Sequence, residues 1–177
     1  MEPLGLCHSV YDYRKVDPQL LVRGHHRDVH GHWVPETFTA PGAFSPIGGV
    51  ISTLRDMVRW MAWLDGDESD AIASDQVLPY AYRRLMQIGH TPIPPVVRSG
   101  SSRGRLTISE ETSIESYGYG LVIEHHPRFG DIVHHSGGYP GYGSDMRWHP
   151  ASGIGMVVLA DGRYATPSVV ASRALHV

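Results

Sequence analysis

The last third of the chain alternates strand-like runs with short turns, and this pattern limits the possible folds more than any other feature. The runs cover residues 117–124, 131–135, 143–149 and 153–160. Glycine and proline dominate the segments between them, as is typical of turns. Consecutive strands joined by short turns pair antiparallel. The sequence therefore predicts an antiparallel meander.

Helical spacing appears before and after these runs. Between residues 53 and 65 the apolar positions are Leu54, Met57, Val58, Met61 and Leu64. This spacing predicts an amphipathic helix with Ser52 or Thr53 as its cap. A weaker pattern covers residues 75–88 and is interrupted by Pro79, and residues 167–175 are expected to form a closing helix on one face of the sheet. The predicted fold class is α/β, an antiparallel sheet meander with packing helices.

The rest of the chain is expected to form loops within one domain that spans residues 1–177. Residues 1–48 and 92–113 are rich in glycine, proline and polar residues. The composition, 41% hydrophobic and 19% charged, is that of an ordinary globular domain. A net charge of −3 does not favour nucleic acid as a partner. No signal peptide or membrane span is predicted, so the chain as written is expected to be soluble and cytoplasmic.

The segment His135–Ser144 is the best candidate for a functional site. It reads His-Ser-Gly-Gly-Tyr-Pro-Gly-Tyr-Gly-Ser and follows a strand-like run. Glycines at the end of a strand let another group approach the backbone and leave N–H groups unshielded, as an oxyanion site requires. From spacing alone, a plain glycine-rich turn explains the segment at least as well.

This segment resembles a signature of the serine β-lactamase, DD-peptidase and esterase family, in which a Lys-Thr-Gly or His-Thr/Ser-Gly triplet lies on the strand that lines the active site. Three other segments resemble family motifs in the family's order. Pro3–Leu6 is similar to "PLGM", Gly48–Met57 to the "GGLxSTxxDLxRF" helix opening, and Tyr117–Leu121 to the "YGLGW" strand. The resemblance implies a β-lactamase/transpeptidase-like fold over residues 3–161.

The resemblance also implies roles for the residues of the triplet. His135 would hydrogen-bond the substrate and tune the surroundings of the nucleophile, and the backbone N–H of Gly138 would be one of two oxyanion donors. Ser136 would bind a substrate carboxylate or hydroxyl, and Gly137 would allow close approach. Two further residues are predicted to wall the acyl pocket: Tyr139 and Tyr142.

Two family motifs are missing from the sequence. The only lysine is Lys15 and the residue three positions before it is Asp12, so no Ser-x-x-Lys exists; without asparagine there is no Tyr-x-Asn either. Because both motifs precede "PLGM" in the family, the expectation is a truncated fold without its nucleophile. Such a chain is expected to be inactive alone and to associate through exposed sheet residues, namely Val122, Val133, Val157 and Leu159.

Other catalytic possibilities have simpler explanations. Ser102 fits a Gly-x-Ser-x-Gly elbow, but prolines precede it and no helical pattern follows. The carboxylates Glu110, Glu111 and Glu115 lack an apolar setting that would raise a pKa. Trp60, Met61 and Trp63 are interpreted as core.

The chain has twelve histidines, which raises the question of a metal site. The densest group lies within residues 25–32, where Asp28 or Glu36 would complete a ligand set. The segment is loop-like, and solvated histidines explain it better, so neither a metal nor another cofactor is predicted. His125, His126 and His134 are interpreted as strand-surface or turn residues.

The function predicted from the resemblance is that of a fragment of a serine hydrolase. The intact parent would act through an acyl-enzyme on a small acyl substrate: a β-lactam, a D-amino-acid peptide or an ester. The alternatives are a non-catalytic binding or regulatory module of the same fold and a gene-prediction artefact without a role of its own. The sequence does not decide between β-lactamase, DD-peptidase and esterase.

Overall fold

A single antiparallel sheet organises the protein, whose computed structural model describes residues 1–43, 45–66, 77–94, 113–162, 165 and 167–175. Six strands lie in the order β3-β4-β5-β6-β7-β8, so each pairs with its neighbours in the sequence. Their bounds are β3 Thr91–Ile93, β4 Ile114–Tyr117, β5 Val122–His126, β6 Gly130–Tyr139, β7 Tyr142–His149 and β8 Ile154–Ala160. All five pairings are antiparallel, which confirms the predicted meander.

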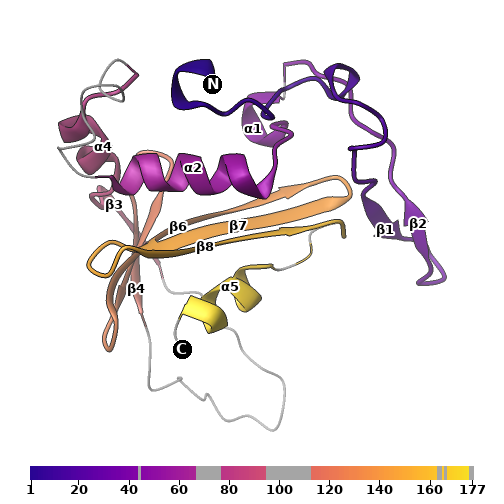
Figure 1. Cartoon of the computed structure of the whole chain (residues 1–177). Helices are drawn as coiled ribbons and strands as arrows, with labels where there is room; N and C mark the ends of the chain where they lie inside the picture. The colour runs from indigo at the N-terminus through magenta and orange to yellow at the C-terminus, as the bar shows by residue number, and fades with distance from the viewer. Residues whose placement is uncertain (44, 67–76, 95–112, 163–164, 166, 176–177) are drawn as a thin grey trace, which may run out of the picture.

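Helix α2 (Leu54–Asp65) covers one face of this sheet (Figure 1). It begins after Thr53, whose side chain accepts a hydrogen bond from the Asp56 N–H over 3.3 Å. The helix buries Met61 and Leu64 of its predicted apolar stripe, whereas Leu54 and Val58 are exposed at 53% and 47%. The buried members of the main core are Met61, Leu64, Leu121, Val133 and Trp148. Trp60 and Trp63 pack against this core. The predicted helix and the core interpretation of these aromatic residues are both confirmed.

Helix α5 (Pro167–Leu175) lies on the opposite face of the sheet (Figure 1). It packs on β7 and β8 and buries Ala171 completely. This is the predicted closing helix, with the predicted bounds. The weaker helical pattern predicted over residues 75–88 corresponds to the shorter helix α4 (Tyr80–Met86). This helix begins directly after Pro79, because proline is tolerated at the start of a helix and not inside one.

The N-terminal segment consists of short elements joined by loops. These are η1 (Glu2–Leu4), η2 (Tyr13–Lys15), β1 (His25–Arg27), β2 (Trp33–Pro35) and α1 (Ser45–Gly48). Strands β1 and β2 form a separate two-stranded sheet beside the β6–β7 turn (Figure 1). The His25 N–H donates to the carbonyl oxygens of Gly141, at 3.3 Å, and Asp161, at 2.8 Å.

Three sequence predictions need correction. The run 117–124 is two strands, β4 and β5, separated by a turn in which Gly120 has φ +74°. The segment 137–141 is not a loop, because β6 continues to Tyr139 and only Pro140 and Gly141 form the turn. Part of the predicted surface excursion is strand β3, while residues 95–112, including Ser102, Glu110 and Glu111, lie outside the described residues.

The four sheet residues that were expected to be exposed differ in their solvent exposure. Val133 is buried at 2% exposure beneath α2, so this prediction is wrong. Leu159 is exposed at 43%, as predicted, and Val122 and Val157 are partly buried. Within the described residues, helices are all too short or too polar to cross a bilayer.

Candidate functional site

The second half of β6 has a free edge. Pairing between β5 and β6 ends where Val122 meets His134. From His135 to Tyr139 the strand is paired, among the described residues, with β7 alone. Backbone groups that point away from the partner of an edge strand are open to another extended chain. The predicted triplet therefore lies where β6 emerges from the sheet.

His135 is the first residue of this free segment. Its register partner in β7 is Met146, and alternation places it on the same face as Val133, the face that α2 covers. The ring is half-buried, and its Nε2 lies 3.3 Å from the hydroxyl oxygen of Tyr117 at the end of β4. This contact restrains the orientation of the imidazole, and the tautomer of the ring decides which of the two atoms donates.

The three residues after His135 are exposed. Ser136 is the register partner of Asp145. Because successive side chains in a strand point to opposite faces, the side chains of Ser136 and His135 lie on opposite faces of β6. A Cβ on Gly137 would meet Ser144 Oγ, so a larger residue there would require the Ser144 side chain to move. Gly138 leaves its backbone uncovered by any side chain of its own, which an oxyanion donor needs.

The two tyrosines hold the N-terminal segment against the β6–β7 hairpin. The Tyr139 ring lies against α1, where a Cβ on Gly48 would come within 3.3 Å of it. The Tyr142 hydroxyl donates to the Val22 carbonyl over 2.9 Å and accepts from the Gly24 N–H over 3.0 Å. Burial raises the pKa of Tyr142. This anchoring role was missed by the sequence analysis, and contact of either ring with a substrate stays a prediction.

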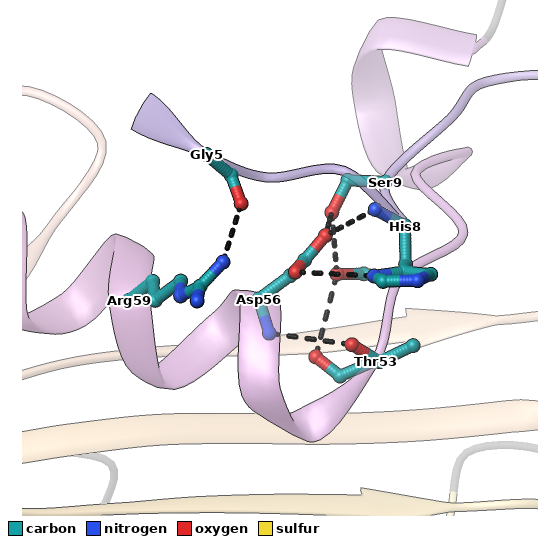
Figure 2. A network of polar contacts seen from close by, with 7 residues as sticks. Gly5, His8, Ser9, Thr53, Asp56 and Arg59 are labelled. Carbon is teal, nitrogen blue, oxygen red and sulfur yellow. Dashed lines mark hydrogen bonds and ion pairs between the residues drawn. The ribbon is translucent and has the colours of Figure 1, made fainter. Parts of the chain in front are cut away.

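A buried carboxylate joins two of the recognised motifs (Figure 2). Asp56 Oδ2 accepts hydrogen bonds of 2.8 Å from the His8 N–H and from Ser9 Oγ, which is also 2.8 Å from Ser52 Oγ. Burial acts to raise the pKa of Asp56, but these donors outweigh it and lower the pKa overall. The network ties the chain after "PLGM" to the start of α2. Sequence analysis placed Asp56 only within the Gly48–Met57 motif and missed this role.

A second polar cluster lies on the face of the sheet away from α2. It contains His134, which is buried at 9% exposure, with Nε2 3.8 Å from Glu115 Oε1. Glu115 stands opposite Glu124 in the register of β4 and β5. Burial, and secondly the Glu124 charge, raises the pKa of Glu115. The prediction that Glu115 lacks a setting that raises its pKa is therefore wrong.

The histidines expected at the surface divide into two kinds. His126 and His134 are buried, at 7% and 9% exposure, so the surface interpretation is wrong for both. His125 is exposed as expected, and its Nδ1 is 2.6 Å from Asp131 Oδ1. Alternation along β5 explains why adjacent residues differ.

The N-terminal histidines do not converge on one point. Three of them are each beside a separate carboxylate: His25 with Asp161 at 3.6 Å, His26 with Glu36 at 3.1 Å and His32 with Asp28 at 3.4 Å. The ring of His30 lies 6.2 Å from that of His32. Among the described residues, the one group of three or more possible metal ligands is Glu115, Glu124 and His134.

Two hollows on the surface lie away from the triplet. One is next to α2 and is lined by residues that include Val58, Met61 and Trp148. The other is beside α5 and includes Phe129 and Leu175. Neither is lined by residues 135–142, so the free strand edge is the feature that marks the candidate site.

Comparison with known proteins identifies one family. The sequence model of the family described as Beta-lactamase matches residues 1–176. No curated protein matches the chain.

Solved structures reproduce the fold over nearly the whole chain. The octameric penicillin-binding protein homologue from Pyrococcus abyssi has a TM-score of 0.72 and 25% identity, over 98% of this chain and 34% of its own. A penicillin-binding protein from Bacillus halodurans has a TM-score of 0.68 and 19% identity, over 99% and 46%. A D-stereospecific amidohydrolase from Streptomyces sp. has 0.68 and 18%, over 98% and 45%. The chain thus spans less than half the length of these proteins.

Proposed function

Because this chain belongs to the β-lactamase family, we propose that it supplies one wall of the active site of a serine hydrolase that transfers acyl groups. The substrate class is a β-lactam, a D-amino-acid peptide or an ester, and the reaction proceeds through an acyl-enzyme. The observation that carries the proposal is the free edge of β6 from His135 to Tyr139. An extended acyl substrate binds there by adding itself to the sheet edge.

The chemistry of the triplet supports this assignment. Gly138 is exposed and has no side chain, so a carbonyl oxygen can reach its N–H. An oxyanion donor must approach to about 2.7–3.1 Å of the developing charge, which a bulky residue would prevent. Gly137 and Ser136 leave the same edge open, and Ser136 offers a hydroxyl to a polar substituent of the substrate.

His135 is proposed as the polar residue beside the reacting centre. It stands next to the free edge and its ring is held by the Tyr117 hydroxyl at 3.3 Å. From there it hydrogen-bonds the substrate and sets the electrostatic surroundings of the nucleophile.

We further propose that this chain does not catalyse the reaction by itself. Acyl transfer needs an activated nucleophile and a base, and the sequence contains neither Ser-x-x-Lys nor Tyr-x-Asn. A polypeptide carrying these two motifs must complete the site.

The test is a comparison of the chain alone with the complemented chain. Alone, it should not hydrolyse a chromogenic cephalosporin or p-nitrophenyl butyrate, and a fluorophosphonate should label no serine. Fused behind the N-terminal part of a relative that carries both motifs, it should gain turnover and one labelled serine. Turnover and a labelled serine in the isolated chain would contradict the fragment proposal.

A second candidate is a non-catalytic binding module, favoured by the same missing motifs. In that case the free edge of β6 holds an acyl-D-amino-acid ligand without cleaving it. Calorimetry with an acyl-D-alanyl-D-alanine peptide separates the two. Saturable binding by the isolated chain, combined with failure of every fusion to turn over substrate, would favour the module.

A further inference from the structure

Three side chains from three adjacent strands converge on the sheet face away from α2. They are Glu115 of β4, Glu124 of β5 and His134 of β6. One possible ligand atom from each lies within 4.8 Å of the other two. Glu115 and Glu124 are direct register partners, and His134 is the partner of Val122, two residues from Glu124. Residues related in this way project from the same face and are close enough to act together.

The charges of this cluster are not balanced. Carboxylates directly opposite each other on neighbouring strands repel. The cation beside them is Arg147, the register partner of His134. Its Nε and Nη2 already donate to the two carboxylate oxygens of Asp145, at 2.8 Å and 3.1 Å, and both residues are buried. Arg147 therefore pairs with Asp145, and because its charge is shared in this way it offsets the carboxylates of Glu115 and Glu124 only in part.

The imidazole of His134 is buried without a hydrogen bond. Within the part of the chain that the structure describes, neither ring nitrogen has a hydrogen-bond partner. The nearest carboxylate oxygen, Glu115 Oε1, is 3.8 Å from Nε2, which is too long for a hydrogen bond. Buried polar groups are nearly always satisfied, so this one calls for an explanation. Burial, and secondly the Arg147 charge, lowers the pKa of His134 to about 4, so the ring is neutral near pH 7.

We propose that Glu115, Glu124 and His134 bind a divalent transition-metal ion, with zinc as the best fit. A neutral imidazole and two carboxylates are three ligands of the kinds that zinc takes, and water completes a tetrahedral shell. Calcium and magnesium prefer all-oxygen sets and are poorer fits. One ion would both neutralise the two carboxylates and give a ring nitrogen of His134 a binding partner.

The geometry requires only a small contraction. Ligand atoms about 2.0–2.2 Å from a tetrahedral zinc ion must come within about 3.5 Å of one another. Glu115 can make this movement, because its side chain is 39% exposed while His134 is held in the sheet. The exposed Glu115 also gives the ion a path from solvent.

The proposed site is separate from the proposed acyl-transfer site. His134 and His135 are adjacent in β6, but their side chains point to opposite faces. A metal ion there fastens β4, β5 and β6 together and does not touch a substrate at the free edge. The inference therefore does not depend on the proposed function.

The experiment uses the metal-stripped full chain. Zn²⁺ binding is measured by calorimetry, and Co²⁺ is used as a spectroscopic probe whose d–d bands report imidazole and carboxylate ligands. One ion per chain is expected. At about one hundred times the dissociation constant, Zn²⁺ should raise the melting temperature by about 5–10 °C. E115Q, E124Q and H134Q should each weaken binding by about tenfold or more.

The control is H32A, because His32 is also beside a carboxylate, Asp28, at 3.4 Å. It should leave affinity and stoichiometry unchanged. Without metal, E124Q should melt above the unchanged chain because it removes the like-charge pair, and with Zn²⁺ the order should reverse.

Either of two results would overturn the proposal. One is the absence of saturable Zn²⁺ and Co²⁺ binding in the unchanged chain. The other is binding that E115Q leaves intact, whatever the effect of H32A. E115Q decides the matter even where E124Q or H134Q fails to fold, because the Glu115 side chain is partly exposed.

Discussion

Ser9 Oγ donates a 2.8 Å hydrogen bond to Asp56 Oδ2, and this bond joins positions 47 residues apart in the sequence. The same oxygen accepts from the His8 N–H, and Arg59 donates to the Gly5 carbonyl one turn further along α2 (Figure 2). The "PLGM"-like segment is thereby fixed to the start of the helix that covers the sheet.

Replacing Asp56 by alanine should destabilise the fold by about 2–4 kcal/mol. The substitution leaves the buried Ser9 hydroxyl and His8 N–H without their acceptor, and each unsatisfied group costs about 1–3 kcal/mol. Urea unfolding monitored by circular dichroism measures the change. The matched control is D17A, because Asp17 is exposed and caps only its own turn at Gln19. An equal effect of the two substitutions would show that the network does not hold the segment.

Gly137 should tolerate alanine only when Ser144 is shortened. A Cβ at Gly137 would collide with Ser144 Oγ across the β6–β7 pair, and overpacking of this kind costs about 1–3 kcal/mol. The double variant G137A/S144A removes the colliding oxygen and should recover most of the lost stability. Thermal melts of both single variants and of the double variant form the test. Additive losses in the double variant would contradict the steric explanation.

Y142F should loosen the N-terminal segment without disturbing the sheet. The hydroxyl bridges the Val22 carbonyl and the Gly24 N–H, and its removal should cost about 1–2 kcal/mol. Trypsin should then cut faster after Arg23 and Arg27, which flank the released segment. Y82F is the control, because Tyr82 is exposed at 58% on α4. Unchanged cleavage rates would mean that other contacts hold this segment.

The stability of the metal-free chain should fall between about pH 6.5 and pH 4 because of His134. Burial, and secondly Arg147, lowers its pKa from 6.5 to about 4 in the folded state. In this window the unfolded chain binds a proton that the folded chain does not, so stability rises with pH and levels off above about pH 7. The contribution is on the order of 2–3 kcal/mol.

The measurement is urea unfolding from pH 4 to pH 8 for the unchanged chain and for H134Q. Glu115 titrates in the opposite sense, since its pKa is raised in the folded state. Its contribution therefore has the opposite sign and cannot produce a fall in stability towards low pH. Parallel pH profiles for the two proteins would contradict the assignment to His134.

Periodicity and turn residues predicted those parts of the fold whose order is local. The 53–65 helix follows from apolar spacing and from its cap, the 167–175 helix was predicted as the element that closes the sheet, and the meander follows from short turns. The split between β4 and β5 was missed because the run 117–124 reads as one strand across Gly118 and Gly120. The end of β6 was misplaced because glycines that usually mark a turn are here paired with β7.

The polar clusters were not predicted from the sequence, for a different reason. Glu115, Glu124 and His134 have no metal-ligand spacing along the chain, and only the register of three strands brings them together. The same holds for Ser9 and Asp56, which meet through tertiary packing. The histidines of residues 25–32 show the opposite: they are close in sequence, but His25, His26 and His32 each contact a different carboxylate.

The last prediction concerns His135 in a fusion that carries Ser-x-x-Lys and Tyr-x-Asn. His135 stands at the free edge of β6 with its ring 3.3 Å from the Tyr117 hydroxyl, while His134 points to the other face. H135A should lower kcat/KM by about 10²-fold or more, comparable to the loss of one acid–base or oxyanion contact. H134Q, assayed as folded protein, should leave kcat/KM nearly unchanged and alter stability instead.

Substitution by lysine adds a second readout for the same residue. Because the family triplet that residues 135–137 resemble has either lysine or histidine at this position, H135K should retain more of kcat/KM than H135A. Equal losses of kcat/KM in H135A and H134Q, or equal losses in H135K and H135A, would place the active-site strand elsewhere. His135 is the residue to vary first, because the two histidines share a strand and differ mainly in the face they occupy.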